Sequence, residues 1–120
     1  MSNRSRRKGH DFEREVARKL CRIFPEARRG WQYSRERAEW PCDVDGTPFR
    51  VECKVGKQPN LWSALDQVVR DRALADDPRP VAVIARRNRG KGRSRRDVVV
   101  MLFDEWLQLL EERYGAGGKP

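Results

Sequence analysis

Apolar residues recur at helical spacing in three segments of the chain, which are residues 11–24, 61–75 and 104–114. Pro25 ends the first segment, because proline cannot continue a helix. Asn60 is suited to cap the second segment, and Gly115 is suited to end the third. The pattern therefore predicts three amphipathic helices.

Short apolar or alternating runs predict strands between these helices, at residues 30–34, 40–45, 49–55, 81–85 and 97–103. The pair Asp45-Gly46 marks a tight turn that joins the second and third strands as a hairpin. The run 81–85 is apolar throughout, as in a central strand that is buried on both faces. The order predicts an α/β domain whose mixed sheet is flanked by helices, an αβββαβ core plus a further strand and a C-terminal helix.

The length of 120 residues allows one modest core. We expect a single domain over residues 10–114, a flexible basic arm over residues 1–9 and a flexible tail over residues 115–120. Residues 86–96 carry seven basic residues and no acid, with small residues between them. This basic insert is expected to be a flexible tip between two strands.

Of the properties of the composition, the net charge says most about the partner of the protein. The net charge is +9, and 38% of the residues are charged. Such an excess favours a polyanionic partner, because Lys and Arg displace the counterions that condense on phosphates. No apolar run is long enough to span a membrane, and no signal peptide is recognised, so we expect a cytoplasmic protein without membrane contact.

Cysteine and histidine exclude several kinds of site. Cys21, Cys42 and Cys53 make an odd count without Cys-x-x-Cys spacing, which argues against a disulfide scaffold and a zinc site. His10 is the single histidine and cannot build a histidine-rich metal site alone. No Ser-His-Asp constellation and no phosphate-binding glycine loop of the P-loop type is present.

The predicted hairpin carries the most informative chemistry. Alternation along a strand places one set of side chains in the core, namely Phe49, Val51, Cys53 and Val55. Arg50, Glu52 and Lys54 then share the other face, and Asp43 on the partner strand can project beside Glu52. An Asp and a Glu together form an oxygen site suited to Mg²⁺ or Mn²⁺. The alternative is that these charged residues are an ordinary solvated strand face.

Glu13 lies within the apolar stripe of the first helix, whereas Glu15 lies opposite it. A carboxylate on a buried face costs several kcal/mol, roughly, unless it is paired, protonated or bound to a metal. Arg14 at the edge of the stripe is a candidate partner, so an internal ion pair is one interpretation. The other is that Glu13 is a third acid that points towards Asp43 and Glu52.

Further expectations concern basic, aromatic and amide side chains outside the hairpin. The basic insert is expected to contact phosphates through Arg86, Arg87, Arg89, Lys91 and Arg93, and Arg28, Arg29, Arg4, Arg6, Arg7 and Lys8 extend the same surface. Trp62 and Trp106 are expected in the core because of their helical spacing. Trp31 and Trp40 are candidates for the core or for base stacking, and Gln67 by itself is expected in solvent.

These residues together resemble the PD-(D/E)XK nuclease superfamily, and within it the archaeal-type Holliday junction resolvases and related small phage nucleases. The resemblance runs from Lys8 to about Leu110 and rests on the opening KGHDFERE, on Asp43 and on Glu52-Cys53-Lys54. It implies a restriction-endonuclease-like fold, a Mg²⁺ cofactor for which Mn²⁺ substitutes, and a homodimer acting on branched or duplex DNA.

The resemblance also implies roles for single residues. It implies that Glu13 is an active-site acid, that Arg14 contacts DNA, and that the Cys53 carbonyl is a metal ligand beside Asp43 and Glu52. It places Gln67 near the site, and Arg28 or Arg29 matches an arginine near the first strand. The residue before Asp43 is Cys42 instead of proline, the Asp43–Glu52 interval is short, and the basic insert is not typical of resolvases.

We therefore expect a metal-dependent DNA endonuclease that hydrolyses phosphodiester bonds. In this interpretation Glu13, Asp43, Glu52 and the Cys53 carbonyl hold the cation, Lys54 positions the water, and Gln67 lies nearby. The alternatives are a nicking, flap or restriction-like nuclease, an inactive nucleic-acid-binding protein, and a basic packaging protein.

Overall fold

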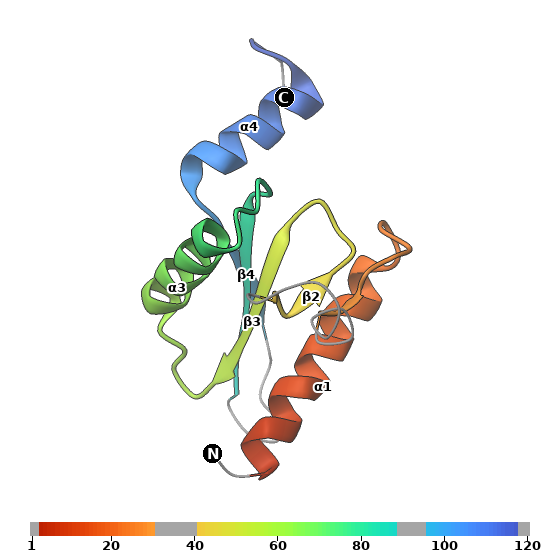
Figure 1. The fold of residues 1–120 in the computed structure, drawn as a ribbon, viewed down its shortest axis with the longest axis vertical. Helices are drawn as coiled ribbons and strands as arrows, with labels where there is room; N and C mark the ends of the chain where they lie inside the picture. Colours follow the sequence, from red (N-terminus) through yellow and green to blue (C-terminus); the bar gives the residue numbers. More distant parts are fainter. Residues whose placement is uncertain (1–2, 31–40, 89–95, 118–120) are drawn as a thin grey trace.

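The computed structural model describes residues 3–30, 41–88 and 96–117 (Figure 1). Within these ranges the chain alternates helices and strands as an α/β domain. The elements are α1 (Asn3–Leu20), β1 (Arg28–Arg29), β2 (Val44–Asp45), β3 (Arg50–Gly56), α3 (Leu61–Leu74), β4 (Val81–Arg87), β5 (Asp97–Val100) and α4 (Phe103–Tyr114).

The described strands form one mixed sheet in the order β1-β2-β3-β4-β5. β1, β2 and β3 are antiparallel neighbours, and the hairpin turn at Asp45-Gly46 has Gly46 at φ 80°, where glycine is unstrained. β3 and β4 are parallel over their whole length, with α3 as the crossover between them. β5 returns antiparallel to β4. The predicted mixed sheet is confirmed.

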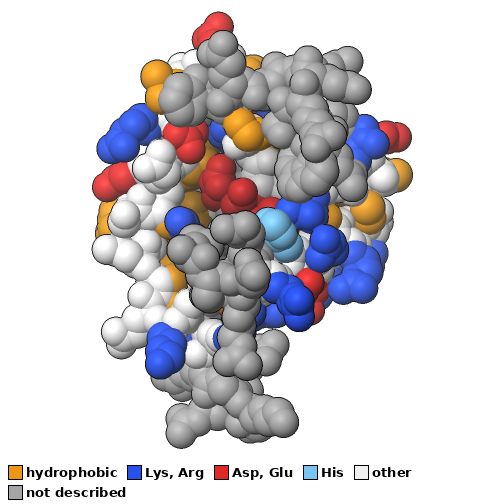
Figure 2. All heavy atoms as spheres, turned by 60° about the horizontal axis from the view of Figure 1, so that its bottom comes forward, with side chains coloured by type: hydrophobic (Ala, Val, Ile, Leu, Met, Phe, Trp, Pro, Cys, Tyr) orange, Lys and Arg blue, Asp and Glu red, His pale blue; other side chains and the backbone are white. Residues whose placement is uncertain are grey.

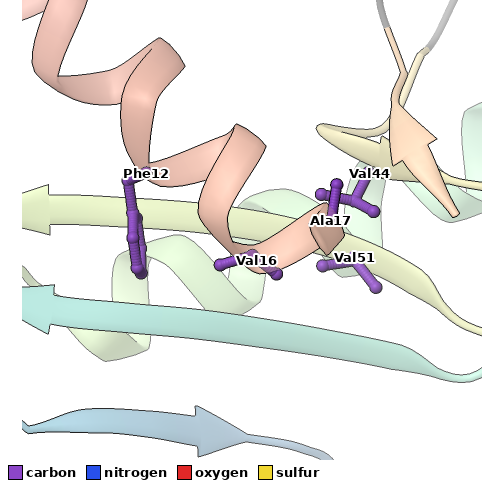
Figure 3. Packing of buried hydrophobic residues seen from close by; sticks show 5 residues of the cluster. All are labelled: Phe12, Val16, Ala17, Val44 and Val51. Atoms are coloured by element: carbon purple, nitrogen blue, oxygen red, sulfur yellow. The ribbon is translucent and has the colours of Figure 1, made fainter. Parts of the chain in front are cut away.

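Helices cover both faces of this sheet, and each face has its own apolar core (Figure 1). On one face Phe12, Val16 and Ala17 of α1 pack against Val44 and Val51 (Figure 3). On the other face α3 covers β4. That core contains Ala64, Leu65, Val68, Val81 and Val83. Alternation along β3 and β4 therefore divides the side chains between α1 and α3.

The first helix differs from its prediction at both ends. It begins at Asn3, so residues 3–9, which were expected to be a flexible arm, lie in the helix. It ends at Leu20, where a turn closed by the Phe24 amide on the Leu20 carbonyl (2.8 Å) replaces the expected last turn. Ile23 lies within the predicted helix 11–24, but it is 71% exposed. Its side chain does not follow the apolar stripe, because the backbone is no longer helical at this residue.

Helices α3 and α4 follow their predicted bounds closely. The Asn60 side chain accepts a hydrogen bond from the Ser63 amide (3.0 Å), as expected of an N-cap. Gly115 ends α4 at φ 77°. The expected burial of two tryptophans is wrong, since Trp62 is 78% and Trp106 is 46% exposed. Trp62 lies at the edge of the stripe that faces the sheet, and α4 projects away from the sheet with no buried residue (Figure 1).

Ion pairs hold the hairpin turn against the start of β4. The Arg79 guanidinium binds Asp45 and Asp77 (both 2.8 Å), and Arg50 binds Asp77 at 3.2 Å. These contacts hold the pKa of Asp77 at about 2; the hydrogen bonds from Arg79 outweigh the effect of burial, which acts in the opposite direction.

No helix in the described part of the chain is long and apolar enough to cross a membrane.

Candidate active site

Asp43 lies immediately before β2 and is bonded to strands on both sides. Its amide donates to the Val51 carbonyl (3.0 Å), and its carbonyl accepts from the Gly30 amide (2.9 Å). Its carboxylate Oδ2 accepts from the Cys53 amide at 2.8 Å. β2 pairs with β3 at Val44 and Val51. Beyond this pair, the Asp43 side chain takes the place of a β2 backbone group as the hydrogen-bond acceptor for β3. Asp43 is thereby fixed against the strand that carries Glu52.

Gly30 makes this position of Asp43 possible. A Cβ atom on Gly30 would lie 1.7 Å from the Cys42 carbonyl oxygen, which is far inside contact distance. The absence of a side chain lets the segment before β2 approach the end of β1 closely. Because Cys42 adjoins Asp43, this close approach sets where the carboxylate lies.

The carboxyl group of Glu52 lies close enough to that of Asp43 for the two groups to interact. Burial, together with the charge of Asp43, raises the pKa of Glu52 to about 9, while Arg50 acts in the opposite direction. A hydrogen bond between two carboxyl groups requires a shared proton, because two carboxylates at that distance repel. Binding of a cation to such a pair would require the release of this proton. The predicted juxtaposition of Asp43 and Glu52 is therefore present in the structure.

Glu13 comes from α1 and carries a third acidic group close enough to interact with Asp43. Burial and then the charge of Asp43 raise the pKa of Glu13 to about 6, against the opposing effect of Arg29. The Arg29 Nε atom lies 3.5 Å from Glu13 Oε1, and both side chains are largely buried. The predicted inward direction of Glu13 is confirmed. Its partner is Arg29, however, and not Arg14, which pairs with Asp11 at 3.1 Å.

Cys53 contributes its backbone to the site and its side chain to the core. In a strand the N–H and C=O of one residue point to the same side. The Cys53 amide points to Asp43, so its carbonyl also points towards the edge of β3 where the acids lie. The thiol packs in the α1 core, and burial raises its pKa well above the ordinary value. A nucleophilic thiolate is therefore unfavourable there.

Lys54 is exposed on β3, two residues beyond Glu52 and on the same face of the sheet. Its ammonium makes no ion pair within the described part of the chain. Figure 2 shows acidic side chains gathered on one face of the molecule, next to the histidine and flanked by Lys and Arg side chains. A cationic group beside an acidic pair is the arrangement expected where a phosphate meets a bound cation.

Gln67 is exposed on α3, and its amide Nε2 donates to Asp71 Oδ1 at 2.9 Å. Asp71 is a residue that sequence reasoning missed. Its charge contributes to the raised pKa of Glu52, which places it on the side of the sheet that Glu52 faces. The available signal was its spacing four residues after Gln67, which brings both side chains to one helix face. Gln67 thus donates to a residue whose charge acts on Glu52.

The predicted nucleic-acid-binding residues fall into two groups. Arg86 is held by Glu15 and Asp97 and lies over the Phe12 ring, 4.7 Å from the ring centroid. Arg29 is buried against Glu13. The remainder are exposed, namely Arg7, Lys8, Arg14, Arg28 and Arg87. In this second group Arg14 is paired with Asp11.

Other predictions fall outside the described residues. They are the contacts of Arg89, Lys91 and Arg93, the roles of Trp31 and Trp40, and most of the strand expected at 30–34. The side chains of Arg4 and Arg6 are likewise not described.

The donors at this edge of β3 are oxygen atoms. Within residues 3–30, 41–88 and 96–117, no group of three or more His, Cys, Asp or Glu side chains is arranged to hold a metal ion. Asp43 and Glu52 nevertheless share a proton, and the Cys53 carbonyl points to their side of β3. Two carboxyl groups and a carbonyl are hard oxygen donors of the kind that Mg²⁺ prefers. The pair therefore fits such a cation, and Glu13 is directed to Arg29 instead.

Comparison with protein-family models, with curated proteins and with solved structures gives no match. The function is therefore argued from the residues of this chain alone.

Proposed function

We propose that the protein is a metal-dependent DNA endonuclease of the PD-(D/E)XK type, built on the restriction-endonuclease-like variant of its mixed sheet. The observation that carries this proposal is the Asp43 carboxylate, which accepts a hydrogen bond from the Cys53 amide at 2.8 Å and lies close enough to Glu52 to raise the pKa of that residue. If these residues were only a solvated strand face, nothing would favour two acidic side chains that share a proton. Removing one acid would relieve the repulsion and the burial cost together.

The residues that would hold the cation are Asp43, Glu52 and the carbonyl of Cys53, with Glu13 as a further ligand if it leaves Arg29. Mg²⁺ is the expected ion, and Mn²⁺ is expected to replace it. When bound, the cation acidifies a water molecule and offsets negative charge on the phosphate.

Lys54 has the role of a cationic partner for the substrate. It is exposed on the face that Glu52 shares, so its ammonium can reach a phosphate beside the acids. There it would orient the attacking water and stabilise the charge that develops on the phosphate oxygens. The phosphodiester bond to the leaving oxygen breaks as the bond from water oxygen to phosphorus forms.

DNA is the proposed partner because of the charge of the whole chain, which is +9. The exposed Arg7, Lys8, Arg14, Arg28 and Arg87 would contact backbone phosphates, together with the basic insert. Affinity should then fall steeply with salt, since each phosphate contact releases counterions. The proposal includes a branched DNA substrate of the Holliday junction type. It also includes a location in the cytoplasm of a bacterial, archaeal or phage-infected cell.

A homodimer is also proposed, and α4 is the element that supports it. Phe103, Trp106 and Tyr114 are exposed on this helix. The helix carries four acids and one arginine in a strongly basic chain, so its charge is complementary to the rest of a second copy and not to DNA. An apolar face on an acidic helix therefore favours another copy of this protein as the partner.

The activity is tested by incubating the protein with labelled four-way junctions, flaps, duplex and single strands, in Mg²⁺, Mn²⁺ or EDTA. Cleavage is expected with either cation and not with EDTA. Glu52→Gln and Lys54→Ala should each lower the rate about 100-fold or more. Cleavage in EDTA, or full activity in both variants, would refute the site.

Matched variants separate chemistry from charge and folding. Lys57→Ala removes the same charge from the exposed end of the same segment, and Glu26→Gln makes the Glu52→Gln change on an exposed loop residue. Both should keep activity near that of the wild type. A protein that binds DNA but does not cut it under any of these conditions would instead be an inactive nucleic-acid-binding protein.

A further inference from the structure

A groove lies beside the candidate active site, on the face of the sheet that α3 covers. It is open, has a volume of about 730 Å³ and lies between the end of β4, the start of β5 and the start of α3. Leu61, Ala85 and Val98 contribute apolar surface to it, and Gln58, Arg87 and Arg96 contribute polar groups. No residue proposed above as a metal ligand lines this groove.

The register of the sheet places the groove next to Lys54. Lys54 pairs with Ala85 across the β3–β4 ladder, and Ala85 pairs with Val98 across the β4–β5 ladder. Paired residues point their side chains to the same face, so Lys54 and the floor of the groove form one row across the sheet. Glu52 is in the preceding row on that face, roughly 7 Å away along the strand.

The basic groups of the groove are available to a ligand. Arg87 and Arg96 are both exposed, and neither forms an ion pair within the described residues. The recess on the opposite face of the sheet is different, because the acids Asp11 and Glu15 line it together with its basic residues. The described lining of the groove beside Lys54 has two arginines and no acid, so it offers positive charge to an anion.

The combination of an apolar floor, two guanidinium groups and an amide matches the chemistry of a single nucleotide. A base can lie against the apolar floor or an arginine plane, the guanidinium groups can bind its phosphate, and Gln58 can bond to a base edge. The volume lies within the usual range for a small-molecule site. A paired base cannot lie in the groove, because its faces are stacked and its Watson–Crick edge is paired inside the duplex.

We propose that this groove binds one unpaired nucleotide of the DNA strand, next to the phosphate that is cut. The inference rests on the proposed endonuclease function, and it names the substrate class as DNA with an unpaired nucleotide at the site, such as a bulge or a flap. Uninterrupted duplex would bind through its backbone but would leave the groove without a ligand.

Binding is measured by fluorescence anisotropy in EDTA and at fixed salt, with a duplex that carries a one-nucleotide bulge and with the matched, fully paired duplex. The wild type should bind the bulged duplex about tenfold more tightly. Val98→Gln, which places a long polar side chain on the floor, should abolish this preference. Arg96→Gln should reduce it, while changing the affinity for paired duplex much less.

Two control variants keep charge and folding constant. Val99→Gln makes the same change on the opposite face of β5, where the side chain is 61% exposed, and it should leave the preference intact. Arg113→Gln on α4 removes the same charge as Arg96→Gln, away from the groove. Equal loss of preference in Val98→Gln and Val99→Gln would overturn the assignment of the groove.

The same duplexes with Mg²⁺ distinguish failure of the groove from failure of the active site. Cleavage of both duplexes at equal rates, with equal binding in EDTA, would overturn the groove while the endonuclease stands. Preferential binding of the bulged duplex without any cleavage would overturn the endonuclease and support the groove as a nucleotide site.

Discussion

The carboxylate of Asp43 accepts a hydrogen bond from the backbone amide of Cys53 at 2.8 Å. This contact joins a residue outside the regular sheet to the strand that carries Glu52 and Lys54. It fixes one acid of the pair by a backbone donor, while the second acid is carried by β3 itself. The geometry of the candidate site therefore depends on the edge of β3 at Cys53, where β3 is no longer paired with β2.

Replacing Asp43 by Asn should lower the pKa of Glu52 from about 9 towards the ordinary value of 4.5. The charge of Asp43 and its hydrogen bond both raise that pKa, and the amide removes the charge. Burial remains and is the largest cause, so the pKa should stay above 4.5. NMR titration of the Glu52 carboxyl carbon measures it, and an unchanged value would contradict the contact between the two carboxyl groups.

The stability of the metal-free protein should fall as the pH rises from 4.5 to about 9. Glu13 and Glu52 have raised pKa values in the fold, so the native state binds more protons than the unfolded state in this window. The lowered pKa of Asp77 acts in the opposite direction, but only below its ordinary value of 3.8. Urea unfolding at a series of pH values measures the slope, and Glu52→Gln should flatten it.

Added Mg²⁺ should stabilise the protein more at pH 8 than at pH 5, because the cation competes with the proton that Asp43 and Glu52 share. Removal with EDTA should reverse the effect. The shift in melting temperature at each pH is the measurement, with Glu52→Gln as the variant that should lose the response. Equal stabilisation at both pH values, or an undiminished response in that variant, would indicate that Mg²⁺ binds elsewhere.

Gly30→Ala should destabilise the fold by about 1–3 kcal/mol. The added Cβ would lie 1.7 Å from the Cys42 carbonyl oxygen, so the segment that carries Asp43 must move. Gly9→Ala is the matched control, since its Cβ would meet nothing within 4 Å. In a helix that control should stabilise by roughly 0.5–1 kcal/mol. Urea unfolding gives both values, and similar effects of the two substitutions would argue against the close approach.

Trp106→Ser should shift the protein from dimer to monomer if α4 is the contact between copies. Trp106 is 46% exposed on a helix without buried residues. Trp62→Ser on α3 is the control, because it removes an indole that is even more exposed and lies on another element. Light scattering after size-exclusion chromatography gives the mass. A wild-type monomer at all concentrations, or a dimer that survives Trp106→Ser, would contradict this role of α4.

Much of the secondary structure could be predicted because its causes are local. The Asn60 cap, the Asp45-Gly46 turn and the end of α4 at Gly115 each depend on the conformation of neighbouring residues. The facing of β3 follows from alternation, and the inward direction of Glu13 follows from helical spacing. A local rule fails when the element changes, as at Ile23, where the backbone has left the helix.

The contacts that make the candidate site belong to the tertiary structure. Arg29 is the partner of Glu13 because β1 packs beneath α1, whereas Arg14, its neighbour in sequence, points to Asp11. Sequence spacing likewise does not decide whether a helix stripe is fully covered, which is why Trp62 lies in solvent.

By itself, the sequence determined the order of the elements, the face on which each periodic residue lies and the acidic pair of Asp43 and Glu52. Only the tertiary structure decided that the Asp43 carboxylate binds the Cys53 amide, and that Lys54 adjoins a groove floored by Ala85 and Val98. The reason is physical. Periodicity sets the direction of a side chain within its own element, but the group it meets depends on the register and approach of distant elements.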